Sequence, residues 1–107
     1  MQYMLNINQV RMVEWKLNLQ QAVLFAFLYE VPSWADPVVV DGVGYFRVTK
    51  QEVAEALPAI STKPDTIKRY MAALESTGLI RRVVLCNQPH FQITEKGLLW
   101  EGVNNGQ

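Results

Sequence analysis

The clearest structural signal in the chain is the stretch "STKPDTIKRYMAALESTGLIRR", residues 61–82, which has the marks of one helix with a defined start and end. Pro64 suits the first turn of a helix, where a missing amide hydrogen breaks no bond, and Thr62 or Lys63 precedes it as the cap. Gly78 provides the left-handed residue at which many helices end. We therefore predict a helix over residues 64–77, followed directly by a strand, "LIRRVVLC", that carries two arginines near its start.

The predicted helix has two different sides. Ile67, Met71 and Leu74 recur every three or four residues, so they form an apolar stripe that faces inward, with Tyr70 at its border. Polar residues occupy the other side, where Asp65 and Arg69 have the i, i+4 spacing of a surface ion pair. The residues left free for an outside partner are Thr62, Lys63, Asp65, Thr66, Lys68 and Arg69.

Charge is unevenly distributed along the chain. The whole chain has 10 basic and 10 acidic residues, whereas residues 61–82 contain five basic and two acidic residues and so have a net charge of +3. Phosphates supply most of the sequence-independent affinity for nucleic acid, so a local cationic surface can bind DNA even on a neutral protein. Lysines on a solvated helix face are also common without such a function, and the same face could instead dock a protein.

Two more helices are marked by their caps. Asn18 is a good cap, and the sequence after it, "LQQAVLFAFLYEV", is apolar on most sides, so we expect a central core helix that ends before Pro32. Thr49 and Glu52 form a capping box, which predicts a short helix through Leu57. Near the N-terminus, "YMLNI" is expected to form a short strand and "NQVRMVEW" a short helix.

Two hairpins complete the predicted layout. "VVVDGVGYFRV", residues 38–48, has a tight turn at Asp41-Gly42, and "LIRRVVLC" pairs with "HFQIT" about a turn at residues 87–89, with Cys86 as a strand residue. "EKGLLW" is expected to add a last helical turn. This order is that of an α+β fold, the winged helix-turn-helix, which is mainly helical with a small antiparallel β-wing. We predict one domain over residues 1–100 and a flexible tail over residues 101–107.

A winged helix-turn-helix suggests where further contacts with DNA would lie. Its second helix enters the major groove, and the N-terminal half of that helix reaches the base edges. Arg81 and Arg82 lie at the base of the predicted wing, where one of them can face the DNA backbone. Arg47 and Lys50 flank the start of the preceding helix, whose N-terminal amides could meet a phosphate. His90 is expected near the wing tip, within reach of an adjacent groove.

Other classes of function have little support in the sequence. Cys86 and His90 are the only cysteine and histidine, so we expect no metal site, and the sequence contains neither a nucleophile motif nor a glycine-rich phosphate loop. We therefore expect no enzyme activity and no cofactor. A single cysteine cannot form an internal disulfide, which fits the cytoplasm, and the longest apolar run is too short to cross a membrane. Trp15, Trp34 and Trp100 are expected to close the edges of a small core, although Trp100 or the N-terminal segment could also form a dimer contact.

Several of these segments together resemble a known group of proteins. They are "NLQQAVLFAFL", "PSWA", "LPAISTKPDTIKRYMAALESTGLI" and "FQITEKGLLW". Over residues 5–100 the chain resembles the winged-helix domains at the N-termini of phage and plasmid replication initiators and of related phage-encoded regulators. The resemblance implies recognition of DNA, with Thr62, Lys63, Thr66 and Arg69 at reading-helix positions and Arg81 and Arg82 at wing positions.

Two hypotheses follow. The first is a small cytoplasmic protein that binds double-stranded DNA, in the replication or transcription of a phage or another mobile element. A chain of only this length would act there as a regulator or an accessory factor, as a homodimer or with a replication or regulatory protein. The second is a protein–protein interaction module, an adaptor or inhibitor, that uses the same scaffold to grip another protein.

Overall fold

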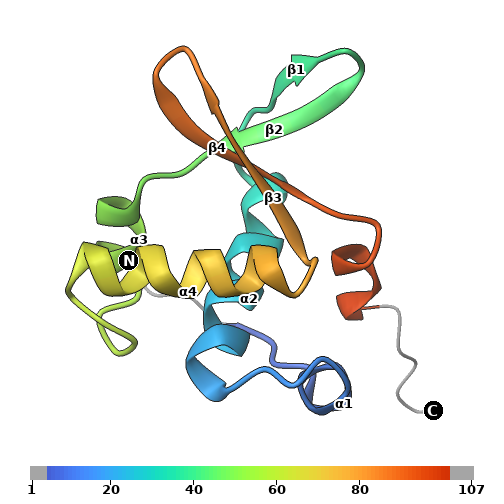
Figure 1. Cartoon of the computed structure of the whole chain (residues 1–107), viewed down its shortest axis with the longest axis vertical. Coiled ribbons are helices and arrows are strands. Elements are labelled where there is room, and N and C mark those ends of the chain that lie inside the picture. The colour runs from blue at the N-terminus through green and yellow to red at the C-terminus, as the bar shows by residue number, and fades with distance from the viewer. Residues whose placement is uncertain (1–4, 102–107) are drawn as a thin grey trace.

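Residues 5–101, the part of the chain that the computed structural model describes, form four α-helices and one four-stranded antiparallel sheet (Figure 1). This confirms the predicted α+β class. The predicted tail lies outside the described residues, apart from Glu101. The helices are α1 (Gln9–Glu14), α2 (Leu19–Glu30), α3 (Lys50–Ala56) and α4 (Pro64–Ser76). The strands are β1 (Val38–Val40), β2 (Val43–Arg47), β3 (Ile80–Leu85) and β4 (Gln88–Ile93), and two short 3-10 helices are η1 (Val31–Ser33) and η2 (Gly97–Glu101).

The helix ends follow the local signals in the sequence. The Asn18 side chain accepts a hydrogen bond from the amide of Gln21, which caps α2. Thr49 and Glu52 form the predicted capping box at the start of α3. Lys63 is the N-cap of α4 but makes no side-chain capping bond, and Gly78 follows the helix at φ 87°. The capping box fixes where α3 begins, and Pro64 occupies the first turn of α4, so the two helices present defined side chains at their exposed ends.

The sheet joins the two hairpins in the order β1-β2-β4-β3. β2 meets β4 through the pairs Phe46–Phe91 and Arg47–His90, and β3 pairs with β4 along its whole length. Figure 1 shows both hairpins projecting from the same end of the molecule, with tips that diverge.

The second hairpin turns earlier than predicted. Its turn residues are Cys86 and Asn87, both left-handed at φ 52° and 61°, so Cys86 is not a strand residue and the predicted turn at residues 87–89 is wrong. In a two-residue hairpin the first pair of flanking residues is hydrogen-bonded and the next pair is not. Pro89 occupies that second position opposite Val84, where it needs no amide hydrogen to reach β3.

The core lies where α2 and α4 meet the sheet. Phe25, Ile67, Leu74 and Phe91 are fully buried. As predicted, α2 is buried on most sides, although its first residue, Leu19, is 58% exposed because it precedes the part of the helix that the other elements cover. The buried residues of α2 are Ala22, Leu24, Phe25, Ala26, Phe27 and Leu28.

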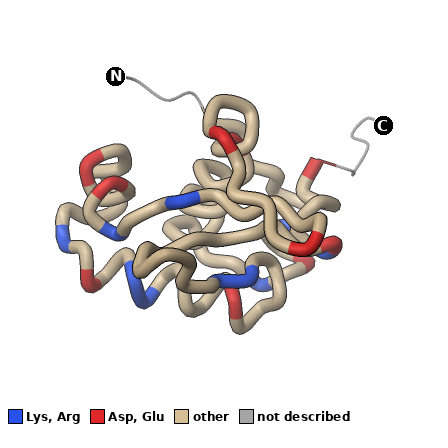
Figure 2. Tube along the Cα trace, turned by 90° about the horizontal axis from the view of Figure 1, so that it is seen from above, with Lys and Arg blue, Asp and Glu red and all other residues tan. Residues whose placement is uncertain are grey.

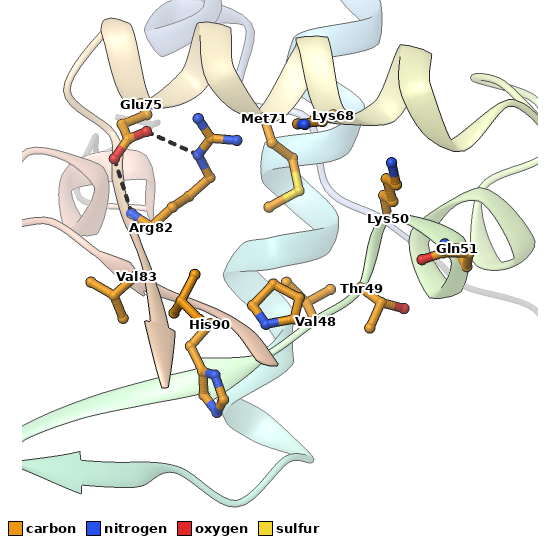
Figure 3. A pocket seen from close by; sticks show the side chains of 12 residues that line it. Val48, Thr49, Lys50, Gln51, Lys68, Met71, Glu75, Arg82, Val83 and His90 are labelled. Atoms are coloured by element: carbon orange, nitrogen blue, oxygen red, sulfur yellow. Dashed lines mark hydrogen bonds and ion pairs between the residues drawn. The ribbon is translucent and has the colours of Figure 1, made fainter. Parts of the chain in front are cut away.

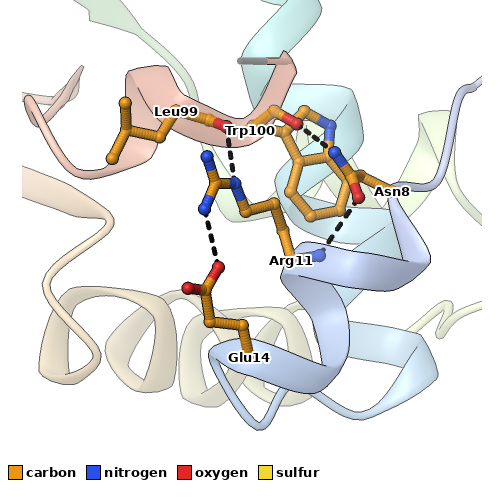
Figure 4. A network of polar contacts seen from close by, with 5 residues as sticks. All are labelled: Asn8, Arg11, Glu14, Leu99 and Trp100. Atoms are coloured by element: carbon orange, nitrogen blue, oxygen red, sulfur yellow. Dashed lines mark hydrogen bonds and ion pairs between the residues drawn. The ribbon is translucent and has the colours of Figure 1, made fainter. Parts of the chain in front are cut away.

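The first and last described segments pack together (Figure 4). The Asn8 side chain donates to the carbonyl of Trp100, and Nε of Arg11 donates to the carbonyl of Leu99 at 2.8 Å. The ring of Trp100 packs edge-on against Phe25 with 5.2 Å between centroids. This contact ties α1 and η2 to the core, so the ends of the described region support the body of the molecule.

The aromatic rings at the edges of the core differ in their roles. Trp15 and Trp100 are buried as predicted, so the Trp100 ring is not available for a dimer contact. Trp34 is 60% exposed, and its expected core role is wrong because η1 carries it past the end of α2. The expected strand at residues 3–7 falls partly outside the described residues, and residues 5–7 are not in a strand.

Candidate nucleic-acid interface

The α4 helix presents one apolar side and one polar side, as predicted. Ile67, Met71 and Leu74 are buried against the rest of the protein. The opposite stripe consists of the exposed residues Asp65, Arg69, Ala72 and Ser76, with Lys68 exposed on one flank and Thr66 half-buried on the other. Thr62 and Lys63 are exposed just before the helix begins. The polar side of α4, with Lys63, Lys68 and Arg69 exposed, is therefore open to a partner.

A groove runs beside α4 (Figure 3). It has a volume of about 550 Å³ and lies between α4, the start of α3 and the β3–β4 hairpin. Lys50, Lys68 and Arg82 bring basic groups to it, and Met71, Val84 and Pro89 add apolar surface. The groove thus joins three elements into one concave surface of mixed character.

An ion pair links α3 to α4 at one end of this groove. Nζ of Lys50 lies 3.0 Å from Oδ1 of Asp65. The hydrogen bond and the positive charge of Lys50 lower the pKa of Asp65 below its ordinary value. The i, i+4 spacing of Asp65 and Arg69 is compatible with a surface ion pair, but within residues 5–101 the carboxylate pairs instead with Lys50 of the neighbouring helix. Arg69 therefore keeps its guanidinium on the exposed side of α4.

A second ion pair links α4 to β3 at the other end. Nε of Arg82 donates to Oε1 of Glu75 at 2.9 Å, and the backbone amide of Arg82 donates to Oε2 at 3.1 Å. The backbone hydrogen bond, followed by the side-chain one, lowers the pKa of Glu75. Because one carboxylate holds both a side chain and a backbone group of β3, this contact fixes the position of the hairpin relative to α4.

The strand register separates the remaining predicted site residues. Paired residues in an antiparallel sheet point to the same face. Arg82 pairs with the buried Phe91 and so faces α4, whereas Arg81 pairs with Gln92 and faces the other way. Arg47 pairs with His90 on that second face, where its Nε lies 3.3 Å from the Gln88 side chain. The structure therefore does not bring Arg47 and Arg81 to the side of α4, whereas His90 borders the groove from the β3–β4 hairpin.

His90 does not lie at the wing tip. Because the turn comes earlier than predicted, His90 is the third residue of β4 and only 5% exposed. Its Nδ1 lies 2.9 Å from the carbonyl oxygen of Gln88, and Figure 3 shows the ring pointing away from α4. The expectation that His90 reaches an outside partner from the tip is wrong, and the exposed tip residues are Cys86 and Asn87.

Several basic side chains near α4 form no ion pair within residues 5–101. Between residues 5 and 101 the ion pairs are Arg11–Glu14, Lys50–Asp65 and Arg82–Glu75. Lys63, Lys68 and Arg69 have no ion-pair partner in this region and are all exposed. Figure 2 shows basic and acidic residues interspersed along the trace, so the cationic surface is local and confined to a few side chains.

Several exposed residues of this surface were missed in the sequence. Gln51 lines the groove beside Lys50, and Ala72 and Ser76 extend the exposed stripe of α4 toward its C-terminal end. The i, i+4 and i, i+7 spacing from Asp65 and Arg69 would have identified Ala72 and Ser76. For Gln51 the signal was its place in the first turn of a capped helix. Short side chains at positions 72 and 76 let a large partner approach the helix backbone closely.

Two further findings concern other kinds of site. Within residues 5–101, no cluster of His, Cys, Asp and Glu side chains is arranged to hold a metal ion. In the same region, every helix is too short or too polar to span a membrane.

Comparison with known proteins gives a likeness of fold. No family model matches the sequence, and no curated protein is significantly similar to it. A solved structure described as the N-terminal domain of a DNA binding protein superposes with a TM-score of 0.60 at 17% sequence identity. The match covers 96% of this chain and 90% of that one. At this identity the likeness shows a shared fold.

Proposed function

We propose that the protein binds duplex DNA as a winged helix-turn-helix. In this proposal α3 and α4 are the helix-turn-helix, α4 enters the major groove and the β3–β4 hairpin is the wing. The observation that carries the proposal is the exposed side of α4, where Lys63, Lys68 and Arg69 have no ion-pair partner among residues 5–101. The fold shared with a domain of a DNA binding protein adds support.

The side chains at the start of α4 would make different kinds of contact with DNA. Lys63 and Lys68 are flexible point charges suited to phosphates, whereas Arg69 can donate two parallel hydrogen bonds to a guanine edge or a phosphate. Thr66 is half-buried beside them and carries a hydroxyl that can serve either target. The negative charge of Asp65 repels DNA phosphates, and its ion pair with Lys50 reduces this repulsion.

The wing would contribute through its α4-facing side and its tip. Arg82 is held by Glu75 in a fixed position beside the groove, so its guanidinium is oriented before DNA arrives. Asn87 stands exposed at the tip and can hydrogen-bond to a base edge or a sugar. Arg81 and Arg47 face away from α4 and would contact DNA only if the duplex extended around the sheet edge.

One observation favours a second candidate function. The groove beside α4 contains Met71, Val84 and Pro89, and two of its three basic residues are neutralised by Asp65 and Glu75. Such a surface suits an apolar side chain of a protein partner. Under either candidate function we propose a binding protein without catalytic activity. If it binds DNA, we propose that it acts in the replication or transcription of a phage or another mobile element.

Salt dependence of binding distinguishes the two candidates. Fluorescence anisotropy of a labelled duplex, measured at several salt concentrations, should give a linear fall of log affinity with log salt. Lys63→Ala, Lys68→Ala and Arg69→Ala should each weaken binding, and each lost phosphate contact should reduce the slope by about 0.9. Lys16→Asn is the matched control, because it removes an exposed positive charge from the α1–α2 turn, at a left-handed position that asparagine tolerates.

The outcomes of this assay distinguish DNA binding by α4, attraction by total charge, and the absence of DNA binding. Loss of affinity in the three α4 variants but not in Lys16→Asn supports DNA binding by α4. Equal losses in all four variants indicate attraction by total charge only. Absence of binding at low salt, with the wild-type protein folded, rejects the DNA proposal and leaves protein docking in the groove.

A further inference from the structure

The β1 strand forms an uncovered edge of the sheet. Among the strands formed by residues 5–101, it is the last in the order β1-β2-β4-β3 and pairs only with β2. Its side chains are three valines, Val38, Val39 and Val40, which are 42%, 63% and 39% exposed. Exposed β-branched residues on a free edge are the usual template for adding another strand.

The free hydrogen-bonding groups of this edge belong to Val39. The β1–β2 turn is the two-residue Asp41-Gly42 turn, so the flanking pair Val40–Val43 is hydrogen-bonded and the next pair, Val39–Gly44, is not. The amide and carbonyl of Val39 therefore point away from β2, toward the open side. An added strand would accept from one of these groups and donate to the other.

Within the described region, the opposite edge of the sheet is occupied at Arg82 but free at Val84, which is 73% exposed. β3 carries Arg81 and Arg82, and the Glu75 carboxylate of α4 binds the backbone amide of Arg82. Charged side chains and bound backbone groups discourage addition of a strand. β1 has no charged residue and no backbone group bound by a side chain among residues 5–101, so of the two edges it is the less protected against pairing.

The charges around β1 indicate the chemistry of its partner. Asp36 and Asp41 are exposed on either side of the three valines, and no lysine or arginine lies between residues 31 and 46. A second copy of the chain would bring the same carboxylates to the seam, which disfavours self-pairing. A strand with basic residues at its ends would place opposite charges beside both aspartates.

We propose that β1 docks an extended segment of a partner protein, with a β-branched centre and lysine or arginine at each end, by strand addition. Backbone hydrogen bonds to Val39 supply the register, and Asp36 and Asp41 select the basic ends. This surface lies at the opposite edge of the sheet from β3, so it is separate from the proposed DNA-binding side of α4.

The test uses the full chain and a synthetic probe. The probe is a short peptide with Thr-Val-Thr at its centre and a pair of lysines at each end, and its twin carries glutamates in place of the lysines. Titrations followed by ¹⁵N–¹H NMR should shift the amides of residues 38–40 with the lysine peptide, and the twin should bind at least about tenfold more weakly. Val39→Pro should weaken the lysine peptide by at least about tenfold, because it removes the outward amide and keeps the β1–β2 ladder.

A matched variant and a mass measurement complete the test. Val39→Thr keeps the amide and should retain peptide binding within about twofold. Absence of amide shifts at about 1 mM lysine peptide, or equal binding of both peptides, would overturn the proposal. A concentration-dependent dimer that Val39→Pro abolishes would identify a second copy as the occupant and would likewise overturn it.

Discussion

The α2 and α4 helices have similar lengths but opposite relations to solvent. α2 has 12 residues and buries six of them on several sides, whereas α4 has 13 and buries only Ile67, Met71 and Leu74. A helix that is buried on several sides contributes mainly to the hydrophobic core, because it has little exposed surface that a partner could contact. α4 holds its place through a narrow stripe and keeps a polar side open. Stability should therefore depend most on α2, and binding should depend most on the exposed side of α4.

The largest expected effect is on α2. Phe25→Ala removes a fully buried ring that packs against Trp15 and Trp100, and it should lower the free energy of unfolding by about 3–5 kcal/mol. Urea denaturation measures the change. Leu19→Ala on the same helix is the control and should stay within about 0.5 kcal/mol, because Leu19 is largely exposed. Similar losses for both variants would mean that α2 is not the centre of the core.

The next test separates the two sides of α4. Ile67→Ala should cost about 2–5 kcal/mol of unfolding free energy, because its side chain is fully buried. Arg69→Ala should change stability by less than about 0.5 kcal/mol while reducing the affinity for duplex DNA. Thermal or urea unfolding, measured beside the anisotropy assay, gives both quantities. A large loss of stability in Arg69→Ala would show that the two sides are not independent.

A smaller effect concerns the contact between α4 and β3. Glu75→Gln weakens the pairing with Arg82 and should cost about 0.5–1 kcal/mol at neutral pH, since both side chains are partly exposed. The pKa of Glu75 is lowered, so its contribution is complete above the ordinary value of 4.5 and is lost as the pH falls through the folded-state pKa. The difference between wild type and variant should therefore shrink below pH 4.5.

Urea denaturation at a series of pH values measures this difference. Glu55→Gln removes an exposed carboxylate of α3 that forms no ion pair within residues 5–101, and its stability should parallel that of the wild type at every pH. A constant difference between wild type and Glu75→Gln across the acid range would contradict the assigned pairing.

The smallest expected effect is on affinity alone. Asp65→Asn removes a negative charge from the exposed stripe of α4 and frees Lys50, so duplex DNA should bind about twofold to tenfold more tightly at low salt. The gain should decrease as salt is added. Asp36→Asn, an exposed acid beside β1, should leave the affinity nearly unchanged. Weaker DNA binding by Asp65→Asn would indicate that the carboxylate itself accepts a hydrogen bond from the partner.

Local signals predicted the fold well. Caps at Asn18 and Thr49, the stop at Gly78 and the apolar spacing of α4 each depend on residues close in sequence, and all appear in the structure. The second hairpin was misread because Pro89 suggested a turn, whereas its position opposite Val84 needs no amide hydrogen.

The candidate site was predicted less completely, because its geometry depends on contacts between elements. Sequence spacing could not show that Lys50 reaches Asp65 or that Glu75 holds Arg82, since each pair joins two different elements. The face on which Arg81, Arg47 and His90 lie follows from strand register, which a shift of one residue in the turn reverses.

The most direct test of the account is to map where duplex DNA touches the protein. Titration of the ¹⁵N-labelled chain with a short duplex should shift the amides of residues 62–72 and of the β3–β4 turn, and leave those of α1 and β1 unchanged. Shifts confined to α1, β1 or the outer face of the sheet would contradict the claim that the open side of α4 is the binding surface.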